Sequence, residues 1–176
     1  QKKGFAEADP TADVEGIDAA NKLSILISLL FGKGVGPDEI PTRGISNVSS
    51  EDIAFAEKFG YKIKLLASAT SKDGQLTCDV EPSLVPQDHP LANVNNEYNA
   101  VYVTGNAVDN LMFYGKGAGP LPTGSAVMGD IIGVARKIEK DAAYDLMSHL
   151  RYEADLEFIG EGCNPYYIRL QTYDRP

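Results

Sequence analysis

Apolar residues recur at helical spacing in three stretches of the chain. The first runs from Ile17 to about Phe31, with Gly16 in front of it and several glycines and a proline behind it. The second runs from Glu51 to Phe59, after two serines that can cap a helix and before a glycine that stops it. The third and longest extends from about Thr123 to Ala143. We therefore predict three helices, two ahead of the central part of the chain and one behind it.

The central part of the chain shows the alternation of β-strands. Tyr61–Ser71 and Gln75–Val85 have strand patterns, and Lys72-Asp73-Gly74 between them is a typical hairpin turn. A second hairpin is predicted from Tyr98–Gly105 and Leu111–Tyr114, with a polar loop between the two arms.

Two shorter segments also have strand-like patterns, Gly44–Val48 and Tyr166–Tyr173. Hairpins with helices before and after them predict an α+β fold. We expect a largely antiparallel or mixed β-sheet, covered on one face by helices, with the other face used for dimerisation. Because the sequence starts at Gln1 and stops just after a strand pattern, we expect a fragment with segments missing on both sides.

Composition narrows the class of protein. The chain has 176 residues, 43% of them hydrophobic, which suffices for a core without disulfide bonds. The formal net charge of −9 argues against a nucleic-acid partner, and the sequence has no long uncharged apolar run that would predict a membrane span. Two cysteines form no disulfide framework or zinc motif, which favours a reducing cytoplasm.

Carboxylates are concentrated near the start of the chain. Five of them fall within twelve positions: Glu7, Asp9, Asp13, Glu15 and Asp18. Their spacing does not match a calcium-binding loop, so we predict no metal site. A solvated acidic loop that leads into a helix is the simplest interpretation, because an acidic residue in the first turn favours the helix dipole.

Helical geometry gives Lys22 a second interpretation. Asp18 lies one turn before Lys22, and both share a side of the predicted helix with apolar residues, namely Ile25, Leu26 and Leu29. Either the two residues form an ordinary surface ion pair, or Lys22 lies in a cleft flanked by carboxylates and is a candidate proton donor or acceptor. The pattern alone leaves both possibilities open.

A glycine-rich turn, Gly115–Pro120, leads into the third helix. Such a turn lets backbone N–H groups approach an anion or a flat ring, but it matches neither the dinucleotide fingerprint nor a P-loop. The remaining candidates are weaker. His89 and His149 are interpreted as surface residues, Cys78 as a core residue and Cys163 as a loop thiol.

Taken together, these motifs resemble those of homoserine dehydrogenases. The resemblance is carried by Gly4–Lys22, which is long and specific, and by the Gly115–Ile132 turn and helix. His89-Pro90-Leu91-Ala92 and Asn99-Ala100-Val101 lie between them in the order that the family shows.

The resemblance implies an oxidoreductase that reduces L-aspartate 4-semialdehyde to L-homoserine with NADPH or NADH, in threonine, methionine and isoleucine biosynthesis. Lys22 matches the catalytic lysine. Glu7, Asp13 and Asp18 match carboxylates that bind the substrate. Positions that approach the nicotinamide are Gly4, Gly117, Ala118 and Gly119. No metal ligand is carried over, although the full-length protein would hold a monovalent cation.

The resemblance also implies a domain organisation. Residues 1–160 would form the substrate-binding and dimerisation domain, with the helix at about 123–143 packing on a missing nucleotide-binding domain that holds most of the cofactor. Residues 161–176 would be a linker and the first strand of a truncated ACT-like domain. We expect a cytoplasmic homodimer, and no turnover by the fragment alone. Two alternatives remain: a non-catalytic ligand-binding or dimerisation module of the same fold, and a dehydrogenase for a different small amino-aldehyde.

Overall fold

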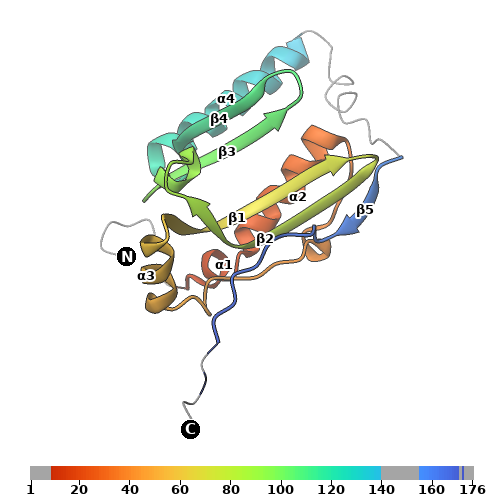
Figure 1. Cartoon of the computed structure of the whole chain (residues 1–176). Helices are drawn as coiled ribbons and strands as arrows, with labels where there is room; N and C mark the ends of the chain where they lie inside the picture. Colours follow the sequence, from red (N-terminus) through yellow and green to blue (C-terminus); the bar gives the residue numbers. More distant parts are fainter. Residues whose placement is uncertain (1–8, 140–154, 171, 173–176) are drawn as a thin grey trace.

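A computed structural model describes residues 9–139, 155–170 and 172 of the chain. Two sheets lie in this part of the chain (Figure 1). The first has the strand order β1-β2-β5, and the second is the β3-β4 hairpin. The strands are β1 (Tyr61–Lys72), β2 (Gln75–Pro86), β3 (Tyr98–Gly105), β4 (Asp109–Lys116) and β5 (Glu157–Gly160). The helices are α1 (Thr11–Val14), α2 (Ile17–Phe31), α3 (Ser50–Lys58) and α4 (Pro120–Glu139), with single 3-10 turns η1 (Pro37–Glu39) and η2 (Pro90–Asn93). The predicted α+β class, with a mixed and an antiparallel sheet, is confirmed.

The β1-β2 hairpin is the longest regular element of the first sheet. It pairs without interruption from Tyr61 opposite Pro86 to Lys72 opposite Gln75. The turn residues Asp73 and Gly74 have φ angles of 52° and 79°. Two consecutive left-handed residues match the right-handed twist of the strands, which is why an Asp-Gly pair predicted this hairpin correctly.

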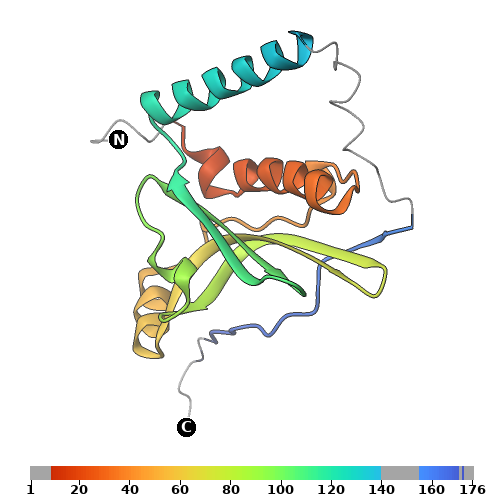
Figure 2. The same cartoon turned by 90° about the horizontal axis from the view of Figure 1, so that it is seen from above.

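The hydrophobic core forms where α2 covers one face of β2 (Figure 2). Ala20, Leu23 and Ile27 lie on one side of α2, at helical spacing, and all are buried. They join alternate residues of β2 in one buried cluster, and these are Leu76, Cys78 and Val80. Full burial of side chains as large as Ile27 and Leu76 contributes about 1.5–3 kcal/mol each. This contact therefore fixes α2 on the sheet.

Helix α3 begins and ends close to where local signals predict. The Ser49 hydroxyl accepts a hydrogen bond from the Asp52 amide at 3.2 Å, and the Asp52 carboxylate accepts one from the Ser49 amide at 2.9 Å. This reciprocal pair is a capping box. After the helix, Gly60 adopts a φ angle of 82°, as expected for a terminating glycine.

Two strand predictions are wrong. Gly44–Val48 forms a turn rather than a strand, and only Thr42 makes an isolated bridge, to Val80. The described residues of Tyr166–Tyr173 form no strand either. The open edge of β2 pairs instead with β5, in parallel, from Gln75 opposite Glu157. Neither segment pairs with a named strand within the described residues, and long-range pairings such as β2 with β5 leave no local signal.

The outer elements of the fold contrast with this core. Helix α4 begins at Pro120, three residues before the predicted start, in accord with the preference for proline in the first helical turn. Its predicted end at Ala143 lies outside the described residues. No residue from Pro120 to Glu139 is buried, and α4 stands apart from α2 in Figure 2. Large apolar side chains are therefore exposed along it, among them Leu121, Met128, Ile131 and Ile138.

Candidate active site

A tight corner at Gly16 sets the position of α2. Gly16 has a φ angle of 79° and is buried between α1 and α2. A Cβ atom at this position would lie 3.0 Å from a methyl group of Val80 and 3.1 Å from the methyl group of Thr42. Both the backbone conformation and the space therefore require glycine. From local sequence signals Gly16 is predictable only as a helix boundary, because its contact with β2 is not local.

The acidic residues before this corner differ in their contacts. The Asp9 carboxylate accepts hydrogen bonds from the Thr11 amide at 3.0 Å and from the Thr11 hydroxyl at 2.5 Å. These bonds lower the pKa of Asp9. Asp13 is exposed on α1. Glu7 and Gly4, predicted to bind substrate and cofactor, lie outside the described residues.

Asp18 and Lys22 pair along α2, as their spacing predicts. The Lys22 ammonium lies 2.5 Å from the Asp18 carboxylate, and the two side chains are 58% and 45% exposed. Two apolar residues of the same side, Ile25 and Leu29, are each 61% exposed. Within the described residues this is a surface ion pair on the side of α2 that does not join the core. A cleft around it would need cover from other parts of a larger protein.

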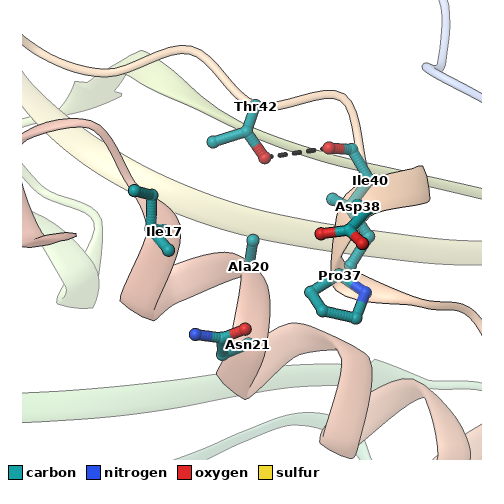
Figure 3. Close-up of a pocket in the computed structure, with 7 residues that line it drawn as sticks. All are labelled: Ile17, Ala20, Asn21, Pro37, Asp38, Ile40 and Thr42. Atoms are coloured by element: carbon teal, nitrogen blue, oxygen red, sulfur yellow. Dashed lines mark hydrogen bonds between the residues drawn. The ribbon is translucent and has the colours of Figure 1, made fainter.

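A shallow pocket adjoins the first turns of α2 on a different side (Figure 3). Its volume is about 310 Å³. It is lined by Ile17, Ala20, Asn21, Pro37, Asp38, Ile40 and Thr42. The Thr42 hydroxyl donates a hydrogen bond to the Ile40 carbonyl at 2.9 Å and so faces its own backbone. Lys22 does not line this pocket, although it follows Asn21 directly, so the pocket and the ion pair are separate features of α2.

Residues 41–46, which we call the strap, tie the corner to the sheet. The Arg43 amide donates to the Val80 carbonyl at 2.7 Å, and the Ile45 amide donates to the Val14 carbonyl at 2.8 Å. The Ser46 hydroxyl donates to the Glu15 carboxylate. The strap therefore holds Glu15, one of the five clustered carboxylates, in a structural contact. Sequence reasoning missed the strap, and the glycine at position 44 was its one local signal.

The glycine-rich turn joins β4 to α4. The Gly117 amide donates to the Glu97 carbonyl at 2.9 Å, and a Cβ atom on Gly117 would collide with the side chain of Asn99. Gly119 has a φ angle of 122°, which favours glycine. Packing and backbone conformation thus explain both glycines within the chain, and neither is by itself a sign of a cofactor. Ala118, between them, is partly exposed.

Of the histidine and cysteine candidates, His89 and Cys78 make structural contacts. His89 accepts a hydrogen bond from the Leu91 amide at 3.2 Å, and its ring lies 4.7 Å from that of Tyr102. His149 lies outside the described residues. Cys78 is 1% exposed, and burial raises the pKa of its thiol to about 11, which confirms the predicted core residue. Cys163 is exposed in a loop, as predicted.

No group of three or more histidine, cysteine or acidic side chains among the described residues is arranged to hold a metal ion. None of the helices in this part of the chain is both long enough and apolar enough to cross a membrane.

Comparison with known proteins gives a consistent result. The sequence profile of the homoserine dehydrogenase family matches residues 1–132. The homoserine dehydrogenase of Corynebacterium glutamicum is 51% identical over 178 residues, which cover 98% of this chain and 40% of the relative. The crystal structure of a homoserine dehydrogenase from Thiobacillus denitrificans matches with a TM-score of 0.82 at 41% identity, over 91% of this chain and 38% of that one.

A third match was solved with a nucleotide. It is a hyperthermophilic archaeal homoserine dehydrogenase in complex with NADPH, with a TM-score of 0.60 at 30% identity, over 75% of this chain and 36% of that one. The chain spans about 40% of the length of the curated relatives that it matches.

Proposed function

This chain belongs to the homoserine dehydrogenase family, and we propose that it is the substrate-binding part of an enzyme that reduces L-aspartate 4-semialdehyde to L-homoserine. The observation that carries the proposal is the match over residues 1–132 together with the Asp18–Lys22 pair, which lies within the matched region. The pair lies on a side of α2 that the core does not use, so it is free to face a substrate.

We propose that Lys22 is the acid that protonates the carbonyl oxygen of the aldehyde and the base in the reverse reaction. The Asp18 carboxylate, 2.5 Å away, pairs with the ammonium group of Lys22 and so orients it. Glu7 and Asp13 would join Asp18 in binding the ammonium group of the amino-acid substrate, because a zwitterion needs an anionic partner there. The corner at Gly16 fixes the first turn of α2 and with it the Asp18 backbone.

The family is NAD(P)-dependent, and when bound the nicotinamide supplies the hydride. We propose that Gly4 and the turn residues Gly117, Ala118 and Gly119 lie near its nicotinamide end, with most of the cofactor bound by another domain. Two observations support this proposal, the family and the exposed position of the turn. The glycines themselves do not add support, because contacts and backbone conformation explain Gly117 and Gly119 without a ligand. A monovalent cation, if the full-length enzyme uses one, would bind largely outside this chain.

The domain proposal follows the family as well. We propose that residues 1–160 form the substrate-binding and dimerisation domain and that residues 161–176 lead into an ACT-like domain. The exposed apolar side chains of α4 support the proposal that another domain covers this helix. We further propose a homodimer in the reducing cytoplasm, the latter supported by two free cysteines.

The test uses the full-length enzyme that contains this chain. We would follow reduction of NADP⁺ at 340 nm with L-homoserine for the native protein, for Lys22→Ala and for the control Lys58→Ala. Lys58 is an exposed lysine in the last turn of α3. Because Lys22 is more than half exposed, its removal should leave the fold intact.

We expect Lys22→Ala to lose about 100-fold or more in kcat while Lys58→Ala stays near the native value. Equal activity of the native protein and Lys22→Ala would reject the acid–base role. Homoserine binding without any turnover by the native enzyme would favour a non-catalytic module. Preference for another hydroxy-amino acid would indicate a dehydrogenase for a different amino-aldehyde.

A further inference from the structure

Three side chains fasten the segment after β5 to the strap. The Arg43 guanidinium lies 2.5 Å from the Glu161 carboxylate, and the Tyr166 hydroxyl donates to the same carboxylate oxygen at 2.6 Å. The Arg43 guanidinium also lies over the Tyr166 ring, 5.5 Å from its centre. We call Arg43, Glu161 and Tyr166 the clasp.

Arg43 is the positive centre of this contact. It faces Glu161 and also Glu81 of β2, at 3.8 Å. Burial, with the charges of Glu81 and Glu161, raises the pKa of the nearby Asp79, and the charge of Arg43 opposes that rise. The hydrogen bond with Tyr166 and the charge of Glu161 raise the pKa of Arg43 itself, so the side chain stays charged at any pH of interest. Arg43 thus joins the strap, β2 and the segment after β5.

The strap transmits this attachment to the start of α2. A Cβ atom on Gly44 would lie 2.5 Å from the Val14 carbonyl oxygen and 2.6 Å from the Cα atom of Glu15. The Ile45 amide holds the same carbonyl at 2.8 Å. Because this contact is between backbones, a shift of the strap at residue 44 would bear directly on the Val14–Glu15 backbone rather than on a side chain. Gly16 and Asp18 follow directly along the chain.

We propose that Arg43 is a positioning residue of the active site. By holding the strap against the Val14–Gly16 corner, the clasp fixes the first turn of α2 and so the direction of the Asp18 carboxylate toward the substrate. The inference rests on the proposed function, because it assigns Asp18 to substrate binding. It adds a structural connection between the segment after β5 and the site.

The test compares variants of the full-length enzyme with two readouts. Arg43→Ala and Glu161→Gln remove the ion pair, Tyr166→Phe removes one hydroxyl, and Arg43→Lys keeps the charge without the planar fork. Arg169→Ala is the matched control. Arg169 belongs to the same segment and has a similar exposure, but it binds Glu51 at 2.8 Å and Asp52 at 3.3 Å on α3 rather than the strap.

The first readout is hydrogen exchange of the Ile45 amide, which needs no activity. We expect exchange to become at least about fivefold faster in Arg43→Ala and Glu161→Gln, less so in Tyr166→Phe and Arg43→Lys, and to stay unchanged in Arg169→Ala. The second readout is homoserine oxidation. We expect KM to rise about threefold or more in the same order, because Asp18 binds the substrate, and kcat to fall by a smaller factor, because Asp18 also pairs with Lys22. A fraction of misfolded enzyme would lower kcat and leave KM unchanged, so the rise in KM distinguishes positioning from misfolding.

Unchanged exchange at Ile45 in Arg43→Ala and Glu161→Gln would overturn the clasp. Faster exchange with an unchanged KM would overturn the positioning role. An equal effect of Arg169→Ala on both readouts would also overturn the positioning role of Arg43. The attachment of the segment to α3 would then matter as much as its attachment to the strap. A native enzyme that does not oxidise homoserine would instead reject the proposed function, and the exchange data would still decide whether the clasp exists.

Discussion

Two regions of the molecule differ in how far their apolar side chains are buried. The first region is the β1-β2 hairpin with α2, and the second is the β3-β4 hairpin with α4. In the first region Ile27, Leu76 and Val80 are completely buried in one cluster. In the second, α4 has no buried residue, and Phe113 of β4 is 60% exposed. The first region is stabilised by its own buried contacts, whereas the second has apolar surface that its own contacts leave exposed. Large exposed apolar patches mark contact surfaces in soluble proteins.

Helix α2 of the first region has an inner side and an outer side. Figure 2 shows it between the β1-β2 hairpin and α4. Its inner side contributes Leu23 and Ile27 to the core, and another side carries the Asp18–Lys22 pair with exposed Ile25. The proposed catalytic residue therefore lies on a rigid element but outside the buried region, where a substrate and a second domain have access.

The strongest test of this contrast is a matched pair of truncations in the 176-residue chain. Leu76→Ala in the core should lower the free energy of unfolding by about 2–5 kcal/mol, because a cavity would replace a fully buried side chain. Ile131→Ala on α4, where the side chain is 54% exposed, should change it by less than about 0.5 kcal/mol. Urea unfolding measures both, and similar losses would show that α4 is packed in solution.

A smaller effect is expected at the corner that joins α2 to the sheet. Gly16→Ala should cost about 1–3 kcal/mol of stability, since alanine is strained at a φ angle of 79° and its Cβ would crowd Val80 and Thr42. Gly124→Ala on α4 is the control, because nothing lies within 4 Å of its added Cβ. Thermal unfolding should show a lower midpoint for the first variant and an equal or higher one for the second.

The smallest effect concerns pH. Hydrogen bonds from Ser49 lower the pKa of Asp52, with a further contribution from Arg169. The folded pKa is thus below the unfolded value of about 4, so Asp52 stabilises the fold above that pH and this contribution is lost as the pH falls through the folded pKa. Asp52→Asn should therefore lower the unfolding midpoint at pH 7 and leave it unchanged near pH 2. Asp130→Asn, at an exposed position of α4, is the control.

The features that the sequence predicted well have local causes. The Asp73-Gly74 turn, the Ser49 cap and the glycine bounds of α2 act within a few residues, and each was placed correctly to within one residue. The spacing of Asp18 and Lys22 is local too, and the ion pair formed as expected.

What the sequence could not provide depends on distant partners. α2 has two apolar sides, and only contact with β2 decides that Leu23 is buried while Ile25 and Leu29 are exposed. β5 and the strap were missed for the same reason, since each is defined by a neighbour far along the chain. The roles proposed for Glu7, Asp13 and Gly117 still rest on the family.

The most direct test of the account is homoserine oxidation by the 176-residue chain alone, set beside that of the full-length enzyme. The central claim is that this chain contributes Asp18 and Lys22 to an active site that also needs residues of another domain. We therefore expect NADP⁺ reduction at 340 nm by the full-length enzyme and none above background by the chain alone. Turnover by the isolated chain at a comparable kcat would contradict the claim.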